Sequence, residues 1–409
     1  MIGVSLIIEL MFPLALMLST IGLWKNSHKW RTYLPMFVYV LFIGAYCYTP
    51  MNGSNVDLVR YFPEIEAYGQ LTLKEALTYN DDILFARDIL FWICGKLQVP
   101  HLVPAITTAT VYGVAGYITC DTAERYNYIN HIGLILIVQF FMLPYFSIIN
   151  NIRNVFGFSL IILAAYLDII KKRKGIFIWF CYVAGGLMHL SCFVLVVFRV
   201  LCKLAEKMFE VLLFFPVVFS SIIFFIYNNR ALISIGGSLG SSIQLIIRKL
   251  YIYLTNSSSA YALKVLDSRA YMANRLLMMA AVFLGLVLIY YGIRYNKSYF
   301  HDDKRFYVFS GMIAMMTLAN NVFVLPNYWR FAAAYYVVFG FVIIPFLTKI
   351  GESNLLVKLL TKSTIAIAPL GLLIQLWQVR GFDFKGWGLD MLLTNYLTIA
   401  FQVFKGLFA

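Results

Sequence analysis

The chain has 409 residues, of which 61% are hydrophobic and 13% are charged, with a net charge of +14 and a mean hydropathy of +0.79. A soluble globular protein carries about 45–50% apolar and about 25% charged residues, so this composition excludes an ordinary soluble protein. Apolar stretches recur along the whole chain and approach or exceed the roughly 20 residues that cross a bilayer. The sequence therefore predicts an all-α polytopic membrane protein, and the positive charge does not indicate a nucleic-acid partner.

Twelve apolar windows predict membrane-spanning helices. In chain order they are 2–24, 33–50, 101–120, 131–147, 151–170, 176–190, 191–204, 209–227, 271–293, 306–324, 331–348 and 364–379. The first window contains Glu9 and lacks both a positive leading segment and a small-residue cleavage site, which favours a retained span over a signal peptide. The tail 389–409 is either a further span or a surface helix. We expect about 12 transmembrane helices (11–13) in a single transmembrane domain, 1–409.

The distribution of Lys and Arg orients these spans, because short loops rich in basic residues stay cytoplasmic. The strongest basic loop is 171–174, and weaker groups are Lys25, Lys29 and Arg31; Arg294, Lys297, Lys304 and Arg305; and Lys349, Lys358 and Lys362. All four groups fall on one side only if 176–204 crosses twice and 83–97 does not cross. We therefore expect an external N-terminus and an interfacial or re-entrant helix at 83–97.

The segment 176–204 is the least regular of the predicted spans. Its pattern is compatible with one long helix or with a tight pair of short helices broken around Gly185, Gly186 and His189. The charge distribution above favours the pair.

Two external connections are long, 51–100 and 228–270, and long loops with helical patterns of their own are uncommon unless they are functional. We expect an interfacial helix in the first loop. The second combines a Gly/Ser-rich turn, an amphipathic helix suited to the membrane surface and a polar turn. Both loops are candidates for functional parts of the molecule.

The first loop carries a polar pattern with helical spacing. Asp57, Arg60, Tyr61 and Glu64 fall at i, i+3, i+4 and i+7, which would place all four on one face of a helix. Farther along, we interpret Asp88 as a cap or a solvated charge of the 83–97 helix.

Ionisable residues at membrane depth are costly and are therefore functional candidates. Arg153 follows Asn150 and Asn151 at the external end of a predicted span, where a guanidinium group and two amides suit an anion. The alternative is an interfacial arginine that reaches to lipid headgroups. Arg330 occupies an equivalent place on a later span. Two arginines facing one external cavity would form a receptor for a pyrophosphate, which arginine binds through two hydrogen bonds.

Three further residues are candidates at the same external surface. Arg269 and Arg275 flank the entry to the 271–293 span and would extend a basic rim. His189 lies at a predicted external turn, where hydrogen-bonded packing is the commoner role and catalysis is the alternative. No HExxH motif, helically spaced histidine pair or carboxylate cluster supports a metal. The sequence also has no GxSxG, Walker A or dinucleotide-binding motif, so we expect neither metal nor cofactor.

Several short motifs together carry a family resemblance. They are Asp57-x-x-x-Tyr61, an external helix before the third span, NNIRNVFGFSLIILAAY around Arg153, a basic cytoplasmic loop, MHLS around His189, and NYWRFAAAYY around Arg330. In this pattern, which covers most of the chain, the protein resembles the EpsG-type branch of the Wzy O-antigen and polysaccharide polymerases. It departs from the family in having Asn154, not Gln, after Arg153, and in lacking a glycine before Tyr61.

The resemblance implies a GT-C-like glycosyltransferase of the bacterial inner membrane, with its active site on the periplasmic face. Such an enzyme transfers a growing glycan from undecaprenyl pyrophosphate to the non-reducing end of a lipid-linked repeat unit. A partnership with a chain-length-determining copolymerase is implied by the family alone.

The resemblance also suggests roles for individual residues. Pyrophosphate is a good leaving group, so the site needs arginines to hold its charge and one base for the acceptor hydroxyl. We expect Arg153 and Arg330 to bind pyrophosphate, with Arg269 and Arg275 as auxiliaries. The remaining candidate substrate contacts are Asn150, Asn151, Arg60 and Tyr61. The candidate bases are Asp57 and Glu64, with His189 as the alternative.

Two other functions fit the same spans. An O-antigen ligase would use a similar external site but would transfer glycan to a lipid A core. A lipid-linked oligosaccharide flippase would suit the span count, but it should show repeated halves and short loops, and the chain shows no such self-similarity. A membrane acyltransferase would need a carboxylate partner for His189, and the segment around it contains none.

Overall fold

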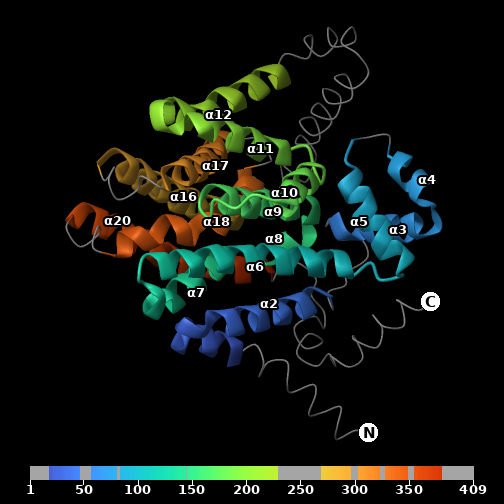
Figure 1. Ribbon diagram of the computed structural model, residues 1–409, viewed down its shortest axis with the longest axis horizontal. Coiled ribbons are helices and arrows are strands. Elements are labelled where there is room, and N and C mark those ends of the chain that lie inside the picture. Colours follow the sequence, from blue (N-terminus) through green and yellow to red (C-terminus); the bar gives the residue numbers. More distant parts are fainter. Residues whose placement is uncertain are drawn as a thin grey trace, which may run out of the picture.

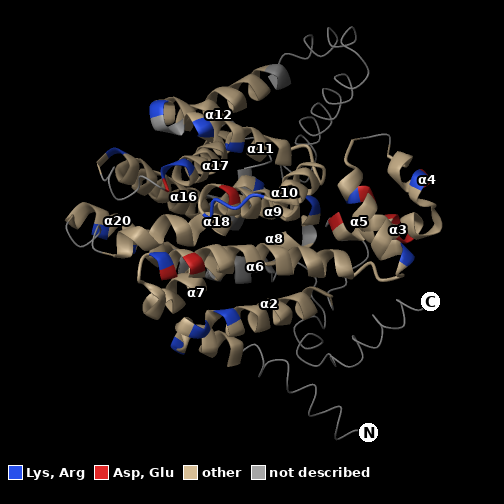
Figure 2. Cartoon of the chain, viewed as in Figure 1, with Lys and Arg blue, Asp and Glu red and all other residues tan. Residues whose placement is uncertain are grey.

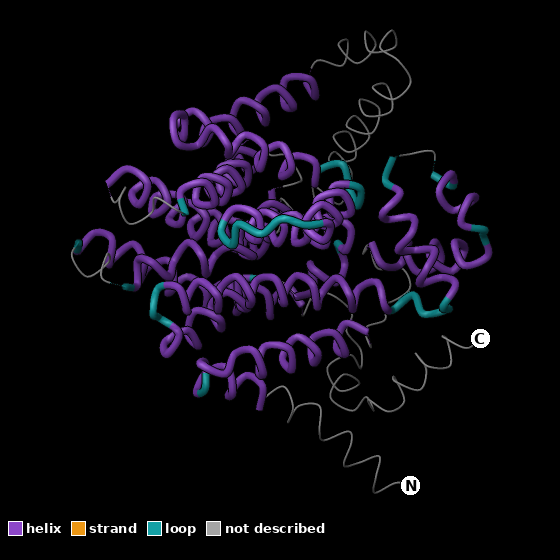
Figure 3. The backbone as a smooth tube through the Cα atoms, in the orientation of Figure 1, coloured by secondary structure: helices purple, strands orange, loops and turns teal. Residues whose placement is uncertain are grey.

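A computed structural model describes residues 18–46, 57–80, 83–143, 145–228, 269–295, 303–322, 328–348 and 354–379. Within these ranges the protein is all-helical and contains no strand (Figure 3). Among the described residues, five helices are long and apolar enough to cross a membrane: Leu102–Arg125, Ile152–Ile169, Lys207–Phe225, Leu276–Tyr295 and Arg330–Leu347. The prediction of a helical membrane protein is confirmed. Most of the first predicted span, the amphipathic helix expected within 228–270 and the tail 389–409 lie outside the described residues.

Figure 1 shows the helical elements of the described residues, coloured along the chain. In order they are η1 (Ser27–Lys29), α2 (Trp30–Tyr46), α3 (Asp57–Gln70), α4 (Leu73–Thr78), α5 (Phe85–Lys96), α6 (Leu102–Arg125), η2 (Ile129–His131), α7 (Ile132–Met142), α8 (Tyr145–Asn150), α9 (Ile152–Ile169), α10 (Ile176–Gly186), α11 (Cys192–Leu201), η3 (Cys202–Leu204), α12 (Ala205–Asn228), α16 (Arg269–Tyr295), α17 (Lys304–Val322), α18 (Tyr328–Ile343), η6 (Ile344–Leu347) and α20 (Leu355–Val379).

Polar contacts gather one set of helix ends, which we call the basic end. The contacts are Arg31–Glu124 (2.9 Å), Lys171–Asp121 (2.6 Å), Arg125–Asp303 (2.5 Å), Arg294–Glu210 (3.2 Å), and the Asn354 amide with the Tyr291 hydroxyl (2.8 Å). They join the start of α2, the end of α6, the loop after α9, the end of α16 and the segments preceding α17 and α20. The charged residues in Figure 2 correspondingly gather towards the helix ends. Members of all four predicted cytoplasmic groups therefore belong to segments that meet at this end.

The segment 176–204 forms a pair of short helices, α10 and α11, joined by residues 187–191. The two glycines at the α9–α10 contact explain how α10 packs so closely on α9. A Cβ atom on Gly157 would lie 2.6 Å from the carbonyl oxygen of Gly185, and a Cβ on Gly185 would lie 2.7 Å from the oxygen of Gly157. With 11 residues, α10 is about 16 Å long, shorter than a helix that spans a bilayer alone.

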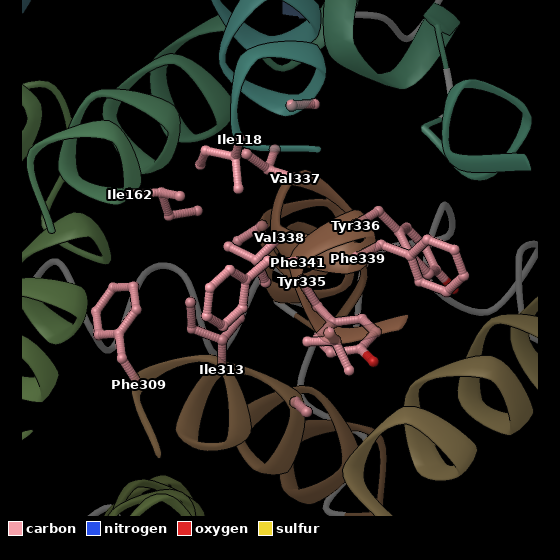
Figure 4. Packing of buried hydrophobic residues seen from close by; sticks show 14 of the residues in the cluster. Ile118, Ile162, Phe309, Ile313, Tyr335, Tyr336, Val337, Val338, Phe339 and Phe341 are labelled. Atoms are coloured by element: carbon pink, nitrogen blue, oxygen red, sulfur yellow. The ribbon is translucent and has the colours of Figure 1, made fainter. Parts of the chain in front are cut away.

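Helix α18 lies at the centre of the bundle (Figure 4). Its side chains pack against Ile118 of α6, Ile162 of α9 and Ile313 of α17, and all of these residues are fully buried. A helix that is apolar on every side is stable only when it is surrounded. The Gln139 amide of α7 donates to the carbonyl oxygen of Tyr336 at 2.9 Å, so a buried polar group fixes α18 against α7. The packing and this hydrogen bond fix the position of α18 in the bundle, and with it the position of its first turn.

Helices α3, α4 and α5 form a lobe beside the bundle, at the end opposite to the basic end (Figure 1). We call this opposite end the far end. The lobe has its own core, in which Tyr61, Tyr68 and Phe91 pack with Ile149 of α8 and Ile152 of α9. The helix predicted at 83–97 is present as α5, and it packs along α3. Its relation to a membrane surface remains a prediction.

The interpretation of Asp88 as a solvated charge is wrong. Asp88 is only 1% exposed. Its carboxylate accepts hydrogen bonds from the Tyr68 hydroxyl at 2.6 Å and from the neighbouring Arg87 guanidinium at 2.5 Å. Burial of a carboxylate is tolerated when a cation and hydrogen-bond donors surround it. The hydrogen bond and burial also raise the pKa of the Tyr68 hydroxyl, with burial the larger cause.

Candidate functional site

The two arginines predicted at membrane depth lie at the far end, in the first turns of two neighbouring helices. Arg153 begins α9 and Arg330 begins α18. Helix α9 ends just before the basic loop 171–174. The start of α17 lies at the basic end, and there the Tyr307 hydroxyl donates to the carbonyl oxygen of Phe341, near the end of α18, at 3.1 Å. Both helices therefore run from the far end to the basic end. The prediction that the two arginines occupy equivalent positions agrees with this arrangement.

The starts of α9 and α18 are also in contact. The rings of Phe158 and Phe331 lie 5.1 Å apart. Cys192, the first residue of α11, lies beside the start of α9, because its thiol donates to the carbonyl oxygen of Asn154 at 3.7 Å. The Nε atoms of Arg153 and Arg330 are both buried. Two helix N-termini, each with an arginine in its first turn, thus lie side by side at the far end, an arrangement that attracts anions.

The predicted polar face of α3 reaches Arg153. The Cζ atom of Arg153 lies 4.9 Å from the centre of the Tyr61 ring, and Cζ of Arg60 lies 5.1 Å from the same centre. Arg60 also donates to the Tyr61 hydroxyl at 3.2 Å and to the Asp57 carboxylate at 3.3 Å. Sequence spacing placed these α3 residues together, but only the packing of the lobe brings them to α9.

The charges around Tyr61 act in opposite directions. Burial is the largest cause that raises the pKa of the Tyr61 hydroxyl, and Arg153 opposes it. The pKa of Arg60 is also raised: its burial acts downward, but Tyr61 and Asp57 outweigh it. Tyr61 is therefore a neutral phenol at physiological pH, and Arg60 keeps its proton.

The two candidate carboxylate bases lie in different surroundings. Asp57 is paired with Arg60, and its side chain is 34% exposed. Glu64 accepts from the Asn80 amide at 3.5 Å, and the same amide donates to the Tyr68 hydroxyl at 2.7 Å. Asp57 thus belongs to the arginine group, whereas Glu64 belongs to the polar network inside the lobe.

His189 is buried in the turn between α10 and α11, close to the start of α9. The backbone N–H of Ser191 donates to its Nδ1 atom at 3.2 Å, and the Ser191 hydroxyl contacts Nδ1 at 2.9 Å and Asn154 Oδ1 at 2.7 Å. Because Nδ1 accepts from a backbone N–H, the neutral ring carries its proton on Nε2. His189 is therefore suited to donate a hydrogen bond through Nε2.

Two residues of this arrangement were missed by sequence reasoning, Ser191 and Asn154. Their signals were present: Ser191 ends the MHLS motif, and Asn154 stands where the resembling family has Gln. Neither signal shows that the two side chains touch, because Ser191 comes from the turn 187–191 and Asn154 from α9.

The other predicted substrate contacts are placed only in part. Asn151 is the N-cap residue of α9, and its side chain makes no capping hydrogen bond. Asn150 ends α8, and Arg269 and Arg275 lie in the first turns of α16. The Tyr336 hydroxyl in the middle of α18 donates to the carbonyl oxygen of Met278 at 3.1 Å, so α16 packs beside α18. The side chains of Asn150, Arg269 and Arg275 lie outside the described ones.

The part of the chain that the structure describes contains no group of three or more His, Cys, Asp or Glu residues suited to a metal ion. No known protein family, curated protein or solved structure matches this chain. Function must therefore be argued from the chemistry of the far end.

Proposed function

We propose that the protein is a polysaccharide polymerase of the Wzy type, which uses a polyprenyl-pyrophosphate-linked donor without a metal. One observation carries the proposal: Arg153 and Arg330 start two neighbouring buried helices at the end opposite to the basic loops. An arginine pair recognises the paired oxygens of a diphosphate. The flanking lobe offers a surface for a bulky glycan beside the charged site.

The sidedness of the site follows from charge. If the basic end is cytoplasmic, the arginine pair faces the periplasm, where lipid-linked repeat units are joined in such pathways. In this topology about twelve helices cross the inner membrane, with α10 and α11 crossing as a short pair. The overall architecture would be GT-C-like, and a chain-length-determining copolymerase is the expected protein partner.

The reaction needs few protein groups. The acceptor hydroxyl oxygen forms a bond to the anomeric carbon of the donor, whose bond to the pyrophosphate oxygen breaks with its electron pair. Undecaprenyl pyrophosphate leaves with the added negative charge, which Arg153 and Arg330 stabilise. The acceptor proton passes to a base, for which Asp57 is the best placed carboxylate because it belongs to the same charged group. His189 contributes a hydrogen bond to a substrate oxygen.

The decisive experiment is reconstitution of the full-length protein in proteoliposomes with purified undecaprenyl-pyrophosphate-linked repeat unit. Without nucleotide and with EDTA, we expect a ladder of polymer lengths on a gel. Arg153→Ala and Arg330→Ala should each lower the rate by at least about a hundredfold, as loss of an electrostatic transition-state group does.

The matched control is Arg31→Ala, which removes an arginine at the basic end whose side chain is 74% exposed. It should leave the ladder unchanged. Normal polymer length from Arg153→Ala at equal expression would contradict the proposal. In cells, a deletion that leaves glycolipid capped with one repeat unit supports a polymerase. A deletion that leaves no capped lipid indicates a ligase, and one that traps substrate on the cytoplasmic side indicates a flippase.

A further inference from the structure

The orientation of Arg153 raises a physical question. An arginine side chain is long and flexible, and two-point binding of a diphosphate requires its planar guanidinium group to be held at a defined angle. The ring of Tyr61 supplies a flat surface, with Cζ of Arg153 4.9 Å from the ring centre. Attraction between a cation and the face of an aromatic ring strengthens when water is excluded, and Tyr61 is only 2% exposed.

Tyr61 is itself firmly held. The ring of Phe91, from α5, lies 5.7 Å from that of Tyr61 within the lobe core. Arg60 donates to the Tyr61 hydroxyl at 3.2 Å, and Asp57 accepts from Arg60 at 3.3 Å. The lobe thus contacts the Tyr61 ring through Phe91 and the Tyr61 hydroxyl through Arg60, independently of Arg153.

The group formed by Asp57, Arg60 and Arg153 keeps a net positive charge. Arg60 and Arg153 repel each other, and the repulsion acts to lower the pKa of Arg60. The Asp57 carboxylate offsets the charge of Arg60, so Asp57, Arg60 and Arg153 together carry one net positive charge. The group therefore still attracts an anion, with Arg153 as the arginine that belongs to the bundle.

From these contacts we propose that Tyr61 is the positioning residue for Arg153, holding its guanidinium group in the orientation that binds pyrophosphate. Asp57 and Arg60 fix the tyrosine from the lobe. This inference rests on the proposed function and assigns a physical role to the Asp57-x-x-x-Tyr61 motif. It also makes the lobe part of the site, since a displacement of α3 would move the ring under Arg153, and small misplacements at a reacting site are costly.

Binding of undecaprenyl pyrophosphate to the purified full-length protein is the primary measurement, because it does not depend on polymerisation. Tyr61→Leu removes the aromatic face and should weaken binding about tenfold. Tyr61→Phe keeps the face and should stay within about threefold of the unmodified protein. Tyr307→Leu is the matched control, because it removes a fully buried tyrosine near the start of α17, away from the lobe. It should lower the thermal stability but leave the dissociation constant unchanged.

A double-mutant cycle separates positioning from general damage. If Tyr61 acts through Arg153, Tyr61→Leu should not weaken binding further in an Arg153→Ala background. Equal losses of binding from Tyr61→Leu and Tyr307→Leu, or an additive loss in the cycle, would overturn the role proposed for Tyr61.

The same variants distinguish this inference from the proposed function. Tyr61-dependent binding of undecaprenyl pyrophosphate without any polymer ladder would support positioning and remove the polymerase proposal. A normal ladder from Tyr61→Leu, with unchanged binding, would overturn positioning alone. Failure of the unmodified protein to bind undecaprenyl pyrophosphate would overturn both.

Discussion

Two aspartates of the lobe show that the neighbours of a side chain decide its role. Asp57 is one-third exposed and pairs with Arg60, whereas Asp88 is 1% exposed and accepts from Tyr68 and Arg87. The first carboxylate belongs to the charged group at Arg153. The second stabilises the lobe from inside, where loss of either partner of a buried pair costs several kcal/mol. The residue type is the same, but only Asp57 is a candidate for chemistry.

His189 provides a test at the residue scale, because its two ring nitrogens can be replaced separately. His189→Gln keeps an N–H group near the position of Nε2, and His189→Asn keeps an acceptor near Nδ1 for the Ser191 N–H. If His189 donates through Nε2, the Gln variant should retain most polymerisation activity, and the Asn variant should lose about three- to tenfold.

The outcomes of this test separate three roles. Losses of a hundredfold or more in both variants would indicate a general base instead of a donor. Full activity in the Asn variant and low thermal stability in the Gln variant would indicate that His189 only holds the turn at 187–191. Activity per folded protein, measured after size-exclusion chromatography, makes the comparison.

At the scale of elements, the contact between α9 and α10 places the two halves of the site. Gly157 lies one turn beyond Arg153, and Gly185 lies one turn before His189. Because the backbones touch at these glycines, the polar chain from Asn154 through Ser191 to His189 can close at 2.7 and 2.9 Å. The separation of the helices therefore determines whether the side chains meet.

Gly157→Ala should lower both stability and activity. The new Cβ would lie 2.6 Å from both the Gly185 carbonyl oxygen and the Cys192 sulfur, so α10 must move, at a cost of about 1–3 kcal/mol. Gly113→Ala in α6 is the control, since its nearest neighbours are side-chain atoms of Val38 at 3.9 Å. The control should gain up to about 1 kcal/mol, because alanine favours a helix. Thermal unfolding in detergent and the ladder assay measure both effects, and equal behaviour of the two variants would refute the argument.

At the scale of the whole molecule, the ion pairs between distant helices and the proposed substrate site lie at opposite ends. The basic end is tied by ion pairs between distant helices, including Arg125 and the 4% exposed Asp303 side chain. The far end concentrates positive charge at Arg153 and Arg330, as a site for an anionic substrate does. A change at the basic end should thus affect folding without affecting the reaction.

Arg125→Ala tests this separation. It removes the cation from a nearly buried carboxylate, which the Tyr126 hydroxyl still contacts at 2.8 Å, and should destabilise the protein by about 1–3 kcal/mol. Arg31→Ala, at an exposed pair, should cost less than about 1 kcal/mol. Polymerisation per folded molecule should be unchanged in both variants. A selective loss of activity in Arg125→Ala would show that the two ends are coupled.

Composition and local pattern alone determined that this is a helical membrane protein, that α3 carries a polar face and that two arginines begin apolar helices. These properties depend on summed hydropathy, helical spacing and charge bias, which need no knowledge of distant contacts. The choice between one helix and two at 176–204, the burial of Asp88, the Ser191–Asn154 link and the contact of Tyr61 with Arg153 were decided by tertiary structure. Each depends on which surfaces of separate helices pack together, and that packing is set by non-local side-chain fit that no single segment encodes.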